Sequence, residues 1–139
     1  MKEEKDMPGL KVLIADDEAH ILAIVSMKLR NAGFDVITAV DGEEAMELVV
    51  AEKPDLLITD NQMPYLTGLE LCKKLRQSGL APSLPVIMLT ARGHDLDSAD
   101  IAAAGISDVL AKPFSPREVL QKVVQLLGHK APIVAEPLK

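Results

Sequence analysis

Short apolar runs alternate along the chain with longer stretches in which apolar residues recur at helical spacing. The runs are nearly continuous in Val, Leu and Ile, which is typical of strands that are buried on both faces of a sheet. Each run is followed by enough residues for one helix. The runs predict five strands, at Lys11–Ala15, Asp35–Ala39, Asp55–Thr59, Pro85–Leu89 and Val109–Ala111.

The stretches between the runs predict five helices. The first places Ile21, Val25 and Leu29 on one face and ends at Gly33, a common stop signal. Asp41 is a suitable N-cap for the second helix, which must end before Pro54. The predicted helices are about Ala19–Ala32, Gly42 to the residue before Pro54, the stretch after Thr67-Gly68 to about Ser78, Asp97–Ala104, and Pro116–Leu127.

This alternation predicts an α/β domain with a parallel sheet covered by helices on both faces. Five strands in the flavodoxin-like order 2-1-3-4-5 would place the first and third strands side by side. The domain is predicted to span residues 10–128. Residues 1–9 and 129–139 are expected to be flexible termini.

Composition narrows the class of protein further. The 139 residues carry a formal charge of −6 and no basic stripe, which argues against a nucleic-acid surface. The apolar stretches are too short to cross a membrane, and no secretory signal is present at the start. Cys72 is the single cysteine and lies on an apolar helical face, so we interpret it as a core thiol. These features predict a cytoplasmic protein.

Polar side chains capable of chemistry stand where the predicted strands end: Asp16, Asp17, Asp60, Thr90 and Lys112. Each has a simpler interpretation alone: the acids could cap helices or loops, Thr90 could be an ordinary strand residue, and Lys112 could be solvated. However, the carboxyl ends of parallel strands meet at one edge of the sheet, where ligands bind. The five residues are therefore expected to form one site.

The expected chemistry of this cluster is phosphoryl transfer. Carboxylates held close together repel one another unless a cation lies among them, and Mg²⁺ prefers oxygen ligands. Lys112 can pair with Asp60 or with a phosphoryl group placed on it, and the Thr90 hydroxyl can donate to a phosphoryl oxygen. A carboxylate nucleophile, a metal and a cationic partner are the parts that this reaction needs.

The ordered motifs resemble the receiver domain of bacterial two-component response regulators over about Leu10 to Leu127. No single segment carries the resemblance, but the set in this order is specific. The matching segments are Val12–Glu18, Asp60–Pro64 with Gly68 following, Pro85–Ala91, and Lys112-Pro113-Phe114.

The resemblance implies a phosphorylated signalling switch rather than a conventional enzyme. Asp60 would accept a phosphoryl group from a histidine kinase or phosphotransfer protein, with self-phosphorylation and dephosphorylation as its only reactions. Lys112 would contact the phosphoryl group, and the Lys112–Pro113 peptide would be cis. Thr90 would move toward the phosphoryl group, and Ala91 would leave space beside it.

The resemblance also implies a magnesium site. Asp17 would bind Mg²⁺ directly, whereas Asp16 would act largely through a metal-bound water. Asp60 would be a further ligand, and Gln62 would contribute its backbone carbonyl, which places no restriction on its side chain.

One position departs from the family pattern. Three residues before Lys112 the family usually has Tyr, Phe or His, but this chain has Val109. A stiff β-branched side chain cannot swing like an aromatic ring, so the switch would depend on backbone shifts. Gln62 and Arg92 flank the site and either tune the lifetime of the phosphoryl group or are ordinary surface residues.

Three other interpretations compete with this one. An aspartyl phosphatase uses similar groups but needs a second acid where this chain has Gln62. A flavodoxin needs a Ser/Thr/Gly-rich phosphate loop after the first strand, where two acids stand instead. A degenerate receiver would not be expected to keep the acid, Thr and Lys set.

The output of the receiver domain would be a downstream protein target or an output domain outside this chain.

Overall fold

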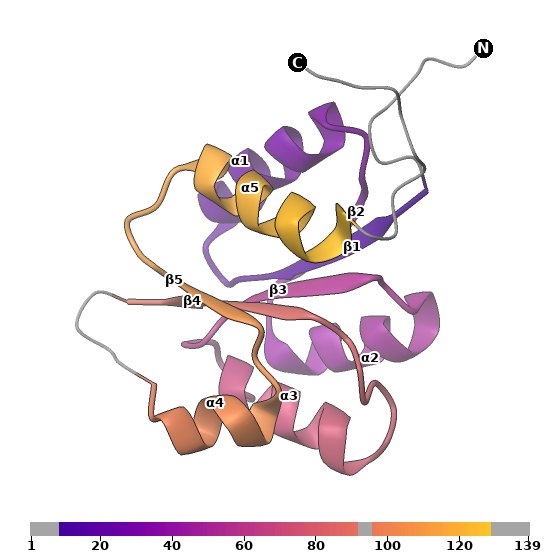
Figure 1. Cartoon of the computed structure of the whole chain (residues 1–139), viewed down its shortest axis with the longest axis vertical. Helices are drawn as coiled ribbons and strands as arrows, with labels where there is room; N and C mark the ends of the chain where they lie inside the picture. The colour runs from indigo at the N-terminus through magenta and orange to yellow at the C-terminus, as the bar shows by residue number, and fades with distance from the viewer. Residues whose placement is uncertain (1–8, 92–95, 129–139) are drawn as a thin grey trace.

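The computed structural model describes residues 9–91 and 96–128; most of the two predicted termini and the loop at 92–95 lie outside these ranges. Five parallel strands form one sheet in the order β2-β1-β3-β4-β5, which confirms the predicted topology (Figure 1). The elements are β1 (Lys11–Ala15), α1 (Ala19–Asn31), β2 (Asp35–Ala39), α2 (Gly42–Glu52), β3 (Leu56–Asp60), α3 (Gly68–Gln77), β4 (Val86–Thr90), α4 (Ser98–Ala104), β5 (Asp108–Ala111) and α5 (Pro116–Leu127).

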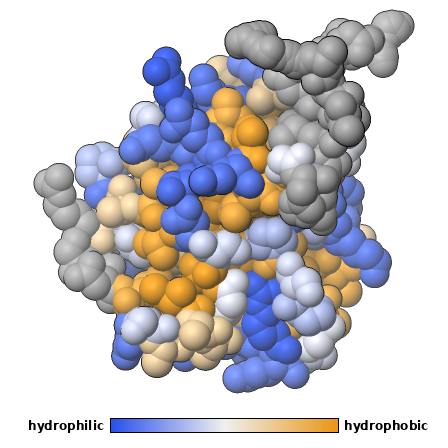
Figure 2. Space-filling view, in the orientation of Figure 1, coloured by the Kyte–Doolittle hydropathy of each residue, from blue (hydrophilic) through white to orange (hydrophobic). Residues whose placement is uncertain are grey.

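The helices cover the sheet in two layers. In Figure 1, α1 and α5 lie on one face of the sheet, and α2, α3 and α4 lie on the other. Alternate strand residues feed two separate hydrophobic cores, as Leu13 and Leu57 do on the second face and Ile14 and Ile58 on the first. On the side shown in Figure 2, hydrophobic residues gather near the level of the sheet, with hydrophilic residues over α5.

Two strands begin and end one residue later than predicted. β3 begins at Leu56 rather than Asp55, and β4 begins at Val86 rather than Pro85. Proline has no N–H to donate to a neighbouring strand, so Pro85 contributes only its carbonyl, which accepts the N–H of Leu57. The shift makes Asp60 and Thr90 the last residues of their strands.

Local capping fixes where the helices start. Asp41 accepts the N–H of Glu44 at 2.8 Å, as expected for the N-cap of α2. Capping boxes at Thr67 and Ser115 begin α3 and α5, and caps of this kind stabilise a helix start by about 1 kcal/mol each.

Among the described residues, no helix is long and apolar enough to cross a membrane.

Candidate functional site

Two adjacent strands bring the predicted carboxylates together. β1 and β3 pair in parallel, with Ala15 beside Thr59, so Asp16 and Asp60 follow at the same edge of the sheet. Asp17 joins them: each of the three residues offers one carboxylate oxygen, and these oxygens lie within 4.8 Å of one another. The structure thus brings together the three acids that the sequence singled out.

Two of these acids are shielded from water. Asp16 is 0% exposed and Asp60 is 4% exposed, whereas Asp17 is exposed. Asp16 Oδ1 accepts the N–H of Glu18 at 2.9 Å, but its buried Oδ2 accepts no hydrogen bond. The N-cap position of α1 is taken by Glu18, so helix capping does not account for Asp17.

Lys112 stands opposite the acids at the end of β5. Its Nζ lies 3.4 Å from Asp16 Oδ2 and 3.5 Å from Asp60 Oδ2, close enough for ion pairing. Its shortest contact, at 2.8 Å, is with Glu18 Oε1. The backbone N–H of Lys112 donates to Thr90 O at 2.7 Å, and the Lys112–Pro113 peptide is cis, as expected.

The pKa values reflect a charged cluster held out of water. Burial, followed by repulsion from Asp16, raises the pKa of Asp60 to about 6, although Lys112 and a backbone hydrogen bond from Gln62 oppose the rise. Burial also raises the pKa of Asp16. Burial works to lower the pKa of Lys112, but the hydrogen bond to Glu18 and the charges of the two aspartates outweigh it and raise that pKa.

The loop after Asp60 is held by its own backbone contacts. A Cβ at Gly68 would lie 2.5 Å from the carbonyl oxygen of Asp60, so only glycine fits there. The N–H of Gly68 donates to Asn61 O at 2.9 Å, and the N–H of Leu69 donates to Asn61 Oδ1 at 3.0 Å. These contacts fix the start of α3 against the last residue of β3.

Of the remaining predicted residues, Thr90 and Gln62 lie at the same edge of the sheet, and Val109 lies within β5. Thr90 is buried at the end of β4, Gln62 is exposed in the loop after Asp60, and Val109 is half-buried in β5. Arg92 lies outside the described residues. Glu18 is the functional candidate that we did not assign from the sequence, although it stands directly after the two aspartates; only its ion pair with Lys112 reveals it.

The acid cluster has the chemistry of a site for a hard divalent cation. Its donors are carboxylate oxygens, and the buried Asp16 Oδ2 has no hydrogen-bond donor of its own. Mg²⁺ and similar ions bind through such oxygens and retain several waters. The residues present therefore fit a bound Mg²⁺.

Comparison with known proteins decides the family. The family model for the response regulator receiver domain matches residues 12–124 of this chain. The chain belongs to this family. Receiver domains act in two-component signalling, and the competing phosphatase and flavodoxin interpretations are set aside.

Relatives and solved structures agree with this assignment. The chain is 44% identical over 117 residues to the alkaline phosphatase synthesis transcriptional regulatory protein PhoP of Bacillus subtilis, covering 84% of this chain and 48% of PhoP. The chain thus spans about half the length of the curated relatives it matches.

Two receiver structures are informative. The chemotaxis response regulator CheY4 of Vibrio cholerae has a TM-score of 0.78 and 35% identity, covering 85% of this chain and 98% of CheY4. The second structure is the receiver domain of the sensor histidine kinase PA1611 of Pseudomonas aeruginosa, which was solved with magnesium coordinated in its active-site cleft. It has a TM-score of 0.76 and 27% identity, covering 86% of this chain and 98% of the PA1611 receiver chain.

Proposed function

We propose that Asp60 is the phosphoacceptor of this receiver domain and takes its phosphoryl group from the phosphohistidine of a histidine kinase or phosphotransfer protein. The supporting observation is a buried carboxylate at the carboxyl edge of the sheet, with Lys112 Nζ 3.5 Å away. An Asp60 oxygen attacks phosphorus, an O–P bond forms, and the P–N bond breaks with its electron pair returning to the imidazole. With a pKa of about 6, Asp60 is mostly ionised and nucleophilic at neutral pH.

Lys112 and Thr90 complete the reaction site in this proposal. Lys112 already lies beside Asp60 and stays cationic, so it can offset the charge that the phosphoryl group adds. Thr90 ends the strand next to Asp60 and can donate its hydroxyl to a phosphoryl oxygen once the backbone brings it closer. Water would later attack the phosphorus and restore the carboxylate.

Mg²⁺ is the proposed metal, held by Asp16, Asp17, Asp60 and the backbone carbonyl of Gln62. When bound, it supplies positive charge that neutralises the phosphoryl oxygens. The PA1611 receiver, which was solved with magnesium in its cleft, supports this assignment by similarity. The buried Asp16 Oδ2 also supports it, because this oxygen accepts no hydrogen bond and has only the ion pair with Lys112, at 3.4 Å.

Acetyl phosphate with Mg²⁺ tests the acceptor. We expect intact-protein mass spectrometry to find one added phosphoryl group, lost in Asp60→Asn and retained in Asp55→Asn. Asp55 is a matched control because it stands just before the other end of the same strand. Phosphorylation that persists in Asp60→Asn would overturn the assignment.

Metal binding separates the roles of the two aspartates beside Asp60. Because Asp17 is proposed as a direct ligand and Asp16 as one acting through water, Asp17→Ala should weaken Mg²⁺ binding more, by roughly 10-fold or greater. Titration of Mg²⁺ by NMR or calorimetry measures this. An Asp17→Ala protein that binds as tightly as the parent contradicts the ligand assignment.

The phosphorylated domain would act in the cytoplasm on a downstream protein or an attached output domain. PhoP is named as a transcriptional regulator, which makes transcription a reasonable output. Because Val109 has no ring to swing, we expect the change to be carried mainly by the loop Ala91–Asp95 and the start of α4. Positions 92–95 of this loop lie outside the described residues. Amide NMR with and without beryllofluoride should show shifts at Ala91 and over Leu96–Ile101; shifts confined to the Asp60 pocket would contradict this route.

A further inference from the structure

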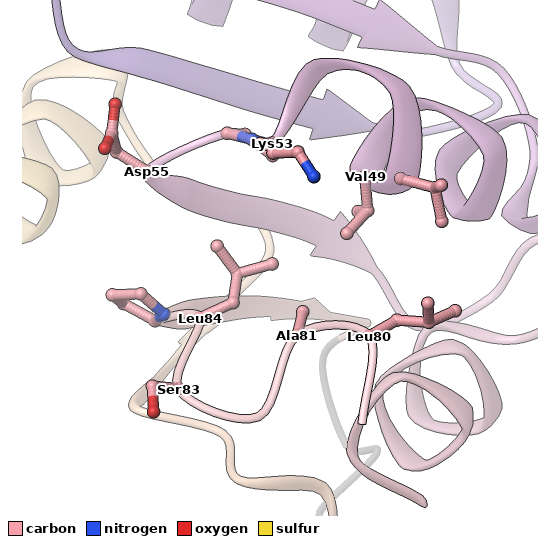
Figure 3. A pocket seen from close by; sticks show the side chains of 10 residues that line it. Val49, Lys53, Asp55, Leu80, Ala81, Ser83 and Leu84 are labelled. Atoms are coloured by element: carbon pink, nitrogen blue, oxygen red, sulfur yellow. The ribbon is translucent and has the colours of Figure 1, made fainter. Parts of the chain in front are cut away.

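We propose that a pocket at the amino edge of the sheet, opposite Asp60, binds a small aliphatic carboxylic acid. The pocket has a volume of about 340 Å³, within the range of small-molecule sites (roughly 300–1,000 Å³). It lies between the C-terminal end of α2, the start of β3 and the loop from α3 to β4 (Figure 3). None of the residues proposed for phosphorylation lines it.

The walls of the pocket suit an aliphatic chain. Val49 and Leu84 are buried and turn toward it, while Leu80 and Ala81 come from the loop on the other side (Figure 3). At its rim, Val50 is 47% exposed and Leu80 is 53% exposed, although both are large apolar side chains. Covering apolar surface of this kind is favourable because it removes that surface from water.

Lys53 gives the pocket its charge preference. It stands at the C-cap of α2 in a left-handed conformation, with φ of 49°, and its side chain extends toward the Val49 side of the pocket (Figure 3). Among the residues that the structure describes, no acid forms an ion pair with Lys53 Nζ. The pocket's carboxylate, Asp55, points away in Figure 3 and accepts the N–H of Lys11 at 2.8 Å. The ammonium group that faces the apolar walls thus suits a carboxylate.

The α3–β4 loop, which forms one wall of the pocket, is held in place before any ligand binds. Arg76 donates to Ala81 O at 2.5 Å and to Leu84 O at 2.6 Å, which anchors both ends of the loop segment. Pro54, Pro82 and Pro85 further restrict the backbone around the pocket. A preformed pocket loses little entropy on binding, so a small ligand can occupy it without ordering a loop.

The test uses sodium octanoate, with octan-1-ol and octylamine as neutral and cationic analogues of the same chain length. Amide NMR titration of the whole chain should give saturable shifts at Val49, Lys53, Leu80 and Leu84, with octanoate binding more tightly than either analogue. Lys53→Met should weaken octanoate binding about fivefold, the effect of one exposed charge pair, without weakening octan-1-ol binding. Lys74→Met, on the exposed part of α3, is the matched control and should change nothing.

A second variant tests the pocket itself. Ala81 turns toward the cavity, so Ala81→Leu should fill it and abolish octanoate shifts while acetyl phosphate still modifies Asp60 (Figure 3). The proposal is overturned if octanoate gives no saturable shifts in the parent, if octanoate and octylamine bind equally well, or if folded Ala81→Leu binds like the parent.

Discussion

Lys112 and Arg76 are two partly buried cations with very different surroundings. Arg76 donates four hydrogen bonds of 2.5–2.9 Å to backbone carbonyls, from Ala81, Leu84, Ala104 and Gly105. Lys112 lies 3.4–3.5 Å from two buried carboxylates. Within the described part of the chain its one closer ion pair is with Glu18, a residue whose side chain is 48% exposed.

The difference separates a cation whose contacts stabilise the fold from one that we propose takes part in phosphoryl transfer. The planar guanidinium matches fixed carbonyls on two segments, the α3–β4 loop and the end of α4, and four of its five N–H donors are occupied in the resting protein. The ammonium of Lys112 is shared among acids that repel one another, and part of their hydrogen-bonding capacity is unused. Replacing Arg76 should only destabilise the fold. The carboxylates around Lys112 repel one another, and we expect a bound metal ion to reduce this repulsion.

The largest effect on stability is expected at Arg76. In Arg76→Met the aliphatic part of the side chain is kept, but four carbonyls lose a charged donor, so we expect a loss of about 3 kcal/mol. Urea unfolding followed by circular dichroism measures the change. The α3–β4 loop and the end of α4 should also lose amide protection from hydrogen exchange.

Arg30→Met is the matched control for this prediction. Arg30 is exposed on α1 and donates one hydrogen bond, to Val36 O at 3.2 Å. Its removal should cost well under about 1 kcal/mol. Equal losses in the two variants would mean that the carbonyl contacts of Arg76 do not stabilise the fold as described.

The next effect has the opposite sign. Asp60→Asn should stabilise the metal-free protein at pH 8 by roughly 1–3 kcal/mol, because it removes an ionised buried carboxylate that faces Asp16. Thermal unfolding in buffer containing a chelator measures this. Adding Mg²⁺ should shrink the difference, because the parent then gains a ligand that the variant binds poorly.

The pH dependence gives this prediction its sign. The pKa of Asp60 is raised to about 6 in the folded state from an ordinary value of 3.8, so the folded protein binds this proton more tightly than the unfolded chain does. The parent should therefore lose stability, relative to Asp60→Asn, as pH rises from about 4 to about 6. A difference that grows as pH falls would contradict the assignment.

The positions of most candidate-site residues could be predicted because the sequence shows where the strands end. Apolar runs located the strands, chain connectivity restricted their order, and that order brought Asp16 and Asp60 together. Boundaries near Asp55 and Pro85 were wrong by one residue because the strand pairing, rather than the apolar pattern, sets where a ladder begins.

The roles of Arg76 and Glu18 were not predicted from the sequence, because hydrophobic periodicity does not indicate their hydrogen-bond and ion-pair partners. Arg76 looks like any basic residue on an amphipathic helix, and its partners are carbonyls in loops whose paths no local pattern specifies. Glu18 joins Lys112 across 94 positions of the chain. Contacts of this kind depend on how the finished fold places its loops, so they become visible only in three dimensions.

The smallest effect is expected at Lys73, the second link between α3 and α4. Lys73 Nζ lies 3.0 Å from Asp100 Oδ1, but both side chains are more than a third exposed. Water and salt screen such a pair, so Lys73→Gln should cost less than about 1 kcal/mol, and less still in high salt. Urea unfolding at low and high NaCl, with Asp100→Asn completing a double-mutant cycle, measures the coupling. A loss as large as that of Arg76→Met, present at low salt and reduced at high salt, would show that charge, rather than the enclosed guanidinium geometry, joins these helices.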